Sequence, residues 1–204
     1  FMAYVGIGSR VFSLGVSESF GFYYWDYHKD PRKLKEFIAR ILGLMLVVQL
    51  VLVIPTLLFG EQLLELLLNT DQDIALKPFL YAVIILSSSM VYYEMFLYLF
   101  RNEGNIKSYA VLSLAALIGF TILTLLFVVI MNYQAQGAIY GRTIGFALSA
   151  FIVFVMVFKR YGIRLNVKFS ISFLAFSFPL FINSIIGAIS FNIDRLMIER
   201  LASL

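Results

Sequence analysis

The sequence predicts an all-α protein that crosses a membrane about six times, and three observations support this fold class. Hydrophobic residues make up 61% of the 204 residues and charged residues only 14%, whereas soluble domains carry about 25% charged residues. Apolar stretches of about 20 residues, long enough to cross a bilayer as a helix, recur along the chain. Lys and Arg gather in alternate loops between them. The expected spans are residues 2–22, 38–59, 79–100, 108–131, 137–158 and 171–193.

The loops between these spans alternate in charge, which predicts their side of the membrane. The loop at 60–78 contains acidic residues against Lys77 alone, and the loop at 132–136 has no charge. The positive-inside rule places the basic loops in the cytoplasm, so residue 1 and the end of the last span lie at the outer face. The basic residues of the other three loops are Lys29, Arg32, Lys33, Lys35, Arg101, Lys107, Lys159, Arg160, Arg164 and Lys168.

The first span is expected to be one continuous helix that carries Arg10 and Glu18. Ionisable residues at membrane depth are costly and therefore mark candidate functional positions. Eight residues separate the two, which is about 12 Å along a helix. We therefore expect both side chains to line a water-filled cavity without touching each other. The alternative for Arg10 is that it extends to the outer lipid headgroups.

The loop after the second span is rich in leucine between residues 63 and 68, which predicts an amphipathic turn on the external surface. The third span carries Glu94, about two turns from its cytoplasmic end. A buried glutamate can bind a proton or cation, or it can pair with a basic residue of a neighbouring helix. Both interpretations of Glu94 stay open.

The fifth span carries a ridge of small residues, at Gly137, Gly141, Gly145 and Ser149. Their spacing of four residues places them on one face, where another helix can pack closely. Arg142 lies about 100° around the helix from this ridge. It can therefore face either a cavity or the headgroups.

The last span contains Pro179, which cannot donate a backbone hydrogen bond and leaves a carbonyl free. Such interrupted helices occur in transporters near binding sites or hinges. Asp194 and Arg195 follow near the end of the span. They can serve function or form a charged external end.

Several function classes are excluded by what the sequence lacks. It has no Cys and one His, His28, in a charged loop, which argues against a zinc site or a thiol nucleophile. The lone Gly6-Ile-Gly8 lies in an apolar segment with no strand before it, so it is not a nucleotide loop. The net charge of +4 fits loops beside anionic lipid rather than nucleic acid. We expect no enzyme, no metal, no cofactor and no nucleic-acid partner.

Four short motifs, in order and spacing, carry a resemblance to a known family. They are Gly-Val-Ser-Glu-Ser-Phe-Gly-Phe-Tyr-Tyr from residue 15 with the basic loop to 35, residues 99–109, residues 136–145, and residues 176–180 followed by 192–196. The chain resembles the Wzx-type O-antigen flippases, the polysaccharide-biosynthesis branch of the MOP superfamily. That superfamily also contains the MATE drug exporters and the lipid II flippases.

The resemblance implies that the chain is a fragment of a transporter with two lobes and about 12 to 14 helices. Residues 1–170 would form most of the first lobe, and residues 171–204 the first helix of the second. The implied function is to flip a polyprenyl-diphosphate-linked oligosaccharide across the inner membrane for O-antigen or other surface polysaccharide synthesis. The diphosphate would be attracted by Arg10, Arg142 and Arg195. Their charge would be balanced, or a coupling H⁺ or Na⁺ bound, by Glu18, Glu94 and Asp194.

Two other functions are compatible with the same spans. A MATE-like multidrug or cation antiporter would depend on Glu18 and Glu94 rather than on the arginines. A membrane-embedded polysaccharide polymerase would need a large external loop with clustered Arg or His. The longest external loop contains Lys77 as its single basic residue, so the polymerase is the weaker alternative.

Overall fold

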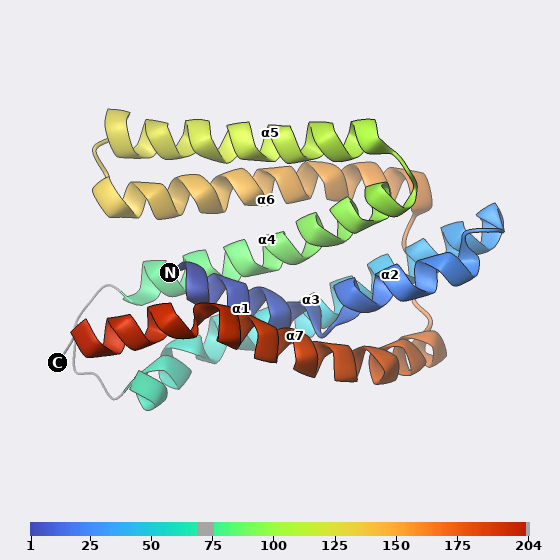
Figure 1. Ribbon diagram of the computed structural model, residues 1–204, viewed down its shortest axis with the longest axis horizontal. Helices are drawn as coiled ribbons and strands as arrows, with labels where there is room; N and C mark the ends of the chain where they lie inside the picture. The colour runs from blue at the N-terminus through green and yellow to red at the C-terminus, as the bar shows by residue number, and fades with distance from the viewer. Residues whose placement is uncertain (69–75, 203–204) are drawn as a thin grey trace.

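The computed structural model describes the backbone of residues 1–68 and 76–202, and the side chains of residues 1–60, 62 and 79–191. The described part of the chain is helical throughout, with short connections (Figure 1). The helices are α1 Met2–Ser13, α2 Val16–Tyr27, α3 Pro31–Leu68, α4 Leu76–Asn102, α5 Ile106–Leu125, the π-helical turn η1 Leu126–Ile130, α6 Gln134–Tyr161 and α7 Val167–Ala202.

Within the described part of the chain, five helices are long and apolar enough to cross a membrane. They confirm the expected second to sixth spans, with ends that differ by several residues. The largest difference is at α3, which continues to Leu68 instead of ending near residue 59. The leucine-rich residues 63–68, expected to form an external amphipathic turn, form the end of α3, and their side chains lie outside the description.

The expectation of one continuous first helix is wrong, because the segment breaks into α1 and α2. Leu14 and Gly15 between them adopt left-handed backbone angles, with φ of 45° and 72°. Glycine reaches this region without steric cost, but a leucine there must be held by its surroundings.

The arrangement of the connections agrees with the expected sidedness. The α2–α3, α4–α5 and α6–α7 connections lie together at one end of the bundle, on the right in Figure 1. We call this the basic end, because the Lys- and Arg-rich loops are located there. The N-terminus and the α5–α6 connection lie at the opposite end.

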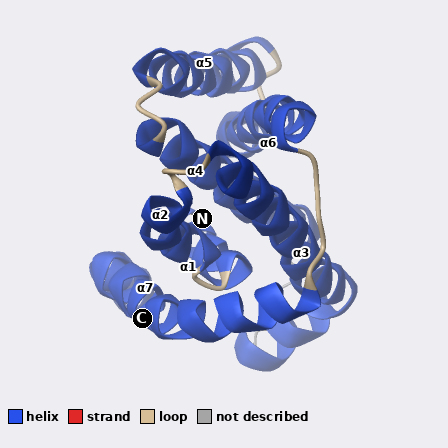
Figure 2. Ribbon diagram, turned by 90° about the vertical axis from the view of Figure 1, so that its right-hand side faces the viewer, coloured by secondary structure: helices blue, strands red, loops and turns tan. Residues whose placement is uncertain are grey.

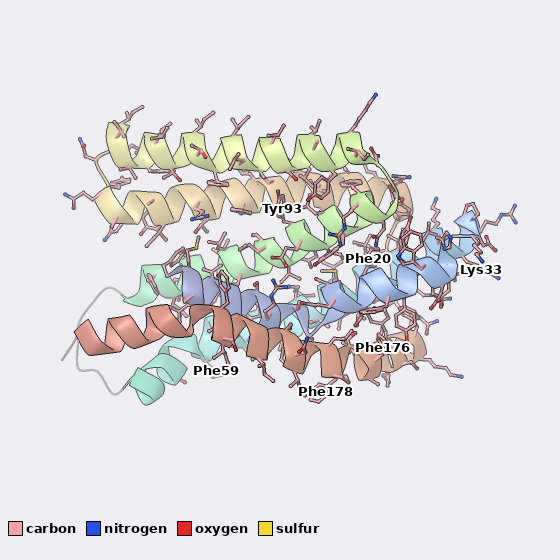
Figure 3. All side chains as sticks on the ribbon, viewed as in Figure 1. Phe20, Lys33, Phe59, Tyr93, Phe176 and Phe178 are labelled. Atoms are coloured by element: carbon pink, nitrogen blue, oxygen red, sulfur yellow. The ribbon has the colours of Figure 1, made fainter. Side chains whose placement is uncertain are left out.

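The core of the bundle is formed mainly by α1 to α4, where Phe20, Phe37, Ile38, Met45 and Phe96 are fully buried. Viewed end-on, α5 lies at one edge of the bundle and α7 at the other, with α1 and α4 between them (Figure 2). Both outer helices expose large apolar side chains, such as Phe178 on α7 (Figure 3). Outward-facing apolar residues are expected of helices that contact lipid or another membrane segment.

The small-residue ridge of α6 packs against α5, which confirms its predicted role in helix packing. A Cβ on Gly141 would lie 2.5 Å from Thr124 Cα, and one on Gly145 would lie 2.6 Å from Phe120 Cα. Only glycine permits backbones to approach this closely.

Candidate binding site at the helix break

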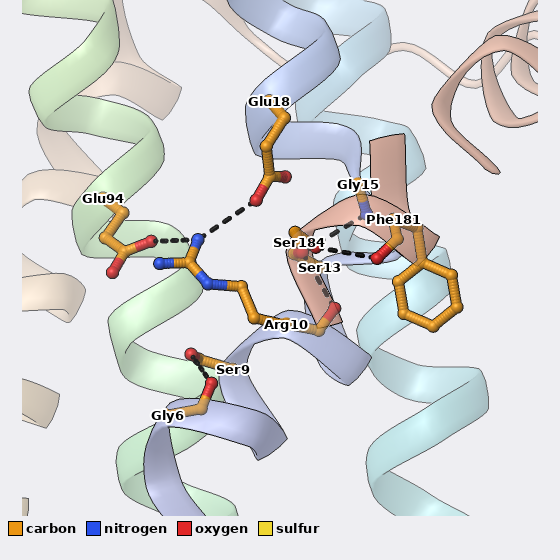
Figure 4. Close-up of polar contacts among 9 residues, drawn as sticks. All are labelled: Gly6, Ser9, Arg10, Ser13, Gly15, Glu18, Glu94, Phe181 and Ser184. Atoms are coloured by element: carbon orange, nitrogen blue, oxygen red, sulfur yellow. Dashed lines mark hydrogen bonds and ion pairs between the residues drawn. The ribbon is translucent and has the colours of Figure 1, made fainter. Parts of the chain in front are cut away.

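Three charged side chains meet beside the break between α1 and α2. Arg10 Nη1 donates hydrogen bonds to Glu18 Oε1 at 3.1 Å and to Glu94 Oε2 at 3.2 Å (Figure 4). Glu94 comes from α4, so the contacts join three helices. We call Arg10, Glu18 and Glu94 the charged cluster.

The expectation that Arg10 and Glu18 cannot touch is wrong, and the helix break is the reason. Their separation was inferred from the rise of a straight helix. The left-handed turn at Leu14 and Gly15 redirects the chain, so that Glu18 in the first turn of α2 reaches back to Arg10 in the last turn of α1. For Glu94, the ion pair with a neighbouring helix is observed.

The helix ends at the break favour these charges. A basic side chain is stabilised near a helix C-terminus and an acidic one near an N-terminus, because of the partial charges on the unpaired backbone groups. Arg10 lies at the C-terminal end of α1 and Glu18 at the N-terminal end of α2. The ion pair therefore bridges two helix ends of complementary polarity.

Two backbone carbonyl groups beside the break accept hydrogen bonds from side chains. Ser13 Oγ donates to the Arg10 carbonyl at 3.0 Å, and Gln49 Nε2 donates to the Phe12 carbonyl at 3.2 Å. Ser88 Oγ in turn donates to Gln49 Oε1 at 2.6 Å. Non-helical backbone at membrane depth is tolerated where protein groups satisfy it in this way.

The side chains of the charged cluster are partly buried. The side chains of Arg10, Glu18 and Glu94 are 31%, 22% and 26% exposed. Glu18 Oε2 is buried and has no hydrogen-bond partner among the described residues. With both carboxylates ionised, two negative charges face one positive charge. The cluster therefore has capacity to take up one further cation or proton.

A cavity of about 250 Å³ extends from the cluster toward the basic end. Arg10 and Glu94 line this cavity, whereas Glu18, which was expected to line a cavity together with Arg10, is not among its lining residues. Tyr98, Arg101 and Tyr109 were not identified from the sequence as site residues. The sequence did offer a signal for two of them, because Tyr98 and Arg101 lie four and seven residues after Glu94 and therefore share its helix face. The lining residues are Arg10, Glu94, Leu97, Tyr98, Arg101 and Tyr109.

The other candidate residues do not join this cluster within the described structure. Arg142 lies over the Phe120 ring of α5, with its Cζ 5.2 Å from the ring centroid. It forms no ion pair among the side chains described, and its Nε is buried without a hydrogen-bond partner there. Asp194 and Arg195 lie in α7, beyond the last described side chain. Within the searched residues, no three His, Cys, Asp or Glu side chains gather as a metal site.

Comparison with known proteins identifies a family. A family model described as polysaccharide biosynthesis protein matches residues 5–204, nearly the whole chain. No curated protein and no solved structure matches the chain.

Proposed function

We propose, from the premise that this chain belongs to the polysaccharide biosynthesis protein family, that it acts in a flippase for a polyprenyl-diphosphate-linked oligosaccharide. The membrane would be the inner membrane, and the product O-antigen or another surface polysaccharide. Residues 1–170 would supply most of one lobe, and residues 171–204 the first helix of a second.

Such a transporter must move a charged diphosphate and a polar glycan across about 30 Å of hydrocarbon. An unpaired charge in that region is costly, so the protein must replace the lost water with its own charged groups. Arginine suits this task, because its planar guanidinium binds phosphate oxygens through two parallel hydrogen bonds. Arg10 is the proposed contact nearest the cavity, with Arg142 and Arg195 as further contacts along the path.

The observation that supports this proposal best is the pairing of Arg10 with Glu18 and Glu94 at a helix break beside a cavity. With both carboxylates bound, Arg10 has little charge to offer an anion. Protonation of Glu18 or Glu94 would remove one competitor and free guanidinium N–H groups for the diphosphate. Loss of that proton would restore the ion pairs and release the substrate. Proton uptake and substrate binding would then be coupled.

A Na⁺ ion between the two carboxylates would neutralise them in the same way, so Na⁺ is the alternative coupling ion. Asp194 would serve a similar balancing role toward Arg195. In either case Arg10 would bind substrate in one state and carboxylates in the other, which would link the charge of the site to alternating access around it.

The experiment that tests the function is complementation of a bacterium that lacks its own O-antigen flippase, supplied with a matched sugar pathway. The full-length protein should restore surface polysaccharide and leave drug resistance unchanged. Arg10→Ala should abolish the restored polysaccharide while the protein remains in the membrane. Arg32→Ala, which removes an exposed arginine of the α2–α3 region, is the matched control and should restore polysaccharide fully.

One observation favours a second candidate, a MATE-like exporter of cationic drugs. The charged cluster has an excess of one negative charge when both carboxylates are ionised, and Tyr98 and Tyr109 line the adjoining cavity. Acidic and aromatic groups together bind organic cations. Raised drug resistance without surface polysaccharide, lost in Glu94→Gln but kept in Arg10→Ala, would identify this function instead.

A further inference from the structure

The cavity contains a second arginine at the end opposite to Arg10. Leu97, Tyr98 and Arg101 follow Glu94 by three, four and seven residues, so the four residues share one face of α4 and line the cavity together. Seven residues separate Glu94 from Arg101, which is about 10 Å along the helix axis. The cavity therefore runs along α4 from the charged cluster to the basic end.

Arg101 differs from Arg40, Arg160 and Arg164 at the basic end, because its guanidinium has no acidic partner among the described side chains. Among the described side chains it forms no ion pair and no hydrogen bond. An arginine left without a carboxylate beside a cavity is available to an anion. The neighbouring arginines that are paired are Arg40 with Glu36 at 2.7 Å, Arg164 with Glu36 at 3.3 Å, and Arg160 with Glu103 at 3.0 Å.

Tyr98 holds Arg101 in place without using its hydrogen-bond donors. Arg101 Cζ lies 4.7 Å from the centroid of the Tyr98 ring, which lies one helical turn earlier on α4. A guanidinium above an aromatic ring is attracted by the ring face, and its N–H groups remain free. Tyr109 of α5 lines the same cavity and is 38% exposed.

The two ends of the cavity therefore differ in charge. Arg10 at one end is neutralised by two carboxylates, whereas Arg101 at the other end is not neutralised by any described residue. An incoming anion would meet an available cation first at Arg101. The N–H groups of the Arg101 guanidinium can donate two parallel hydrogen bonds to phosphate oxygens.

We infer that Arg101, supported by Tyr98 and faced by Tyr109, is a phosphate-binding site at the entrance of the cavity. It takes the diphosphate of the lipid-linked substrate from the basic end before that group reaches Arg10. This inference rests on the proposed flippase function for the identity of the substrate. The same chemistry would also bind the headgroup phosphate of a membrane phospholipid, so the test must separate these two sources.

The test is direct titration of the purified full-length protein with a short-chain prenyl diphosphate, in the absence and presence of phosphatidylglycerol. Arg101→Ala should weaken binding of the prenyl diphosphate by about tenfold or more, as expected for loss of charge-assisted hydrogen bonds. Arg101→Lys keeps the charge but loses the planar fork, and should give an intermediate affinity. Arg32→Ala is the control for general loss of positive charge and should bind as the wild type does.

The outcomes distinguish this inference from the proposed function. Equal affinity of Arg101→Ala and the wild type, in protein with unchanged melting temperature, would overturn the phosphate site. Displacement of the prenyl diphosphate by phosphatidylglycerol at comparable concentrations would assign the site to a lipid headgroup and overturn the substrate assignment. Binding that depends on Arg101, with no transport by the wild type, would support the site and contradict the flippase.

In a transport assay the same site should affect substrate capture more than turnover. Arg101→Ala should raise the half-saturating substrate concentration by about tenfold and leave the maximal rate nearly unchanged. A fall in the maximal rate with an unchanged half-saturating concentration would contradict a role in loading.

Discussion

Gly15 at the break between α1 and α2 packs directly on the backbone of α7, at Ser177. A Cβ on Gly15 would lie 2.4 Å from the Ser177 carbonyl oxygen and 2.9 Å from the Phe181 backbone nitrogen. Pro179 lies between these two residues in the sequence. The break that brings Glu18 to Arg10 therefore depends on contact with a helix more than 150 residues later in the chain.

Gly15→Ala should strongly destabilise the protein. The new methyl group would collide with α7, and the positive φ of 72° would strain any residue other than glycine. We expect a loss of about 2 kcal/mol or more in the free energy of unfolding, measured by thermal unfolding in detergent. Gly21→Ala is the matched control, because nothing lies within 4 Å of its Cβ position. Equal stability of the two variants would contradict the contact with α7.

Gly141→Ala should separate α5 from α6. The added Cβ would lie 2.5 Å from backbone atoms of Thr124, which cannot move aside as a side chain can. We expect destabilisation by about 1–3 kcal/mol, as for overpacking in a core. Gly119→Ala on α5 is the control, because its Cβ position is open. Thermal unfolding compares the two, and a neutral Gly141→Ala would show that the helices are not packed at this glycine.

Gln49→Leu should weaken the break without touching the charged cluster. The substitution removes the donor to the Phe12 carbonyl and the acceptor for Ser88. A buried carbonyl left unpaired costs about 1–3 kcal/mol, and the melting temperature should fall accordingly. Thr56→Val, which removes a hydroxyl bonded within its own helix, is expected to change it much less. A Gln49→Leu protein as stable as the wild type would mean that Gln49 does not cap α1.

Arg10 and Glu94 should be energetically coupled. In a double-mutant cycle with Arg10→Ala and Glu94→Gln, we expect a coupling free energy of about 1 kcal/mol or more for contacting partly buried groups. Lys33 and Asp30, exposed and 3.8 Å apart, form the control pair. Their coupling should be below about 0.5 kcal/mol, as is usual for exposed ion pairs. Coupling of the same size in both cycles would contradict a structured cluster.

Much of the fold could be predicted from the sequence, because the bilayer imposes simple requirements on it. A helix that crosses hydrocarbon must be apolar and long, so five spans are readable from composition. The glycine ridge of α6 was equally readable, since a four-residue spacing fixes one helix face. The positions of the basic loops at one end of the bundle follow from the same regular pattern.

The break at Gly15 could not be predicted, because it is produced by tertiary contact rather than by local composition. Its neighbours Leu14 and Val16 continue the apolar run. Because a straight helix was assumed, Arg10 and Glu18 were expected to be too far apart to touch, and this expectation about the site was wrong as well. Ser13 and Gly15 were the available local signal, as small polar and glycine residues often interrupt helices.

Arg101 was missed for a different reason. Its position at the end of a span was explained by the positive-inside rule, which needs no partner or ligand. Only the structure distinguishes Arg101 from Arg160 and Arg164, because the carboxylates that bind those two arginines come from distant parts of the chain.

The central claim is that Arg10 binds the two carboxylates in one state and the substrate in the other. The most direct test is transport of a lipid-linked oligosaccharide by the full-length protein in proteoliposomes, with and without a proton gradient. Because the proton and the substrate bind to the same state, the wild type should transport faster when the proton concentration is higher on the side from which the substrate is loaded, and Arg10→Ala should not transport. Glu94→Gln, which mimics the protonated carboxyl, should bind substrate but lose the response to the gradient. Transport by Arg10→Ala at the wild-type rate, with the same response to the gradient, would contradict the account.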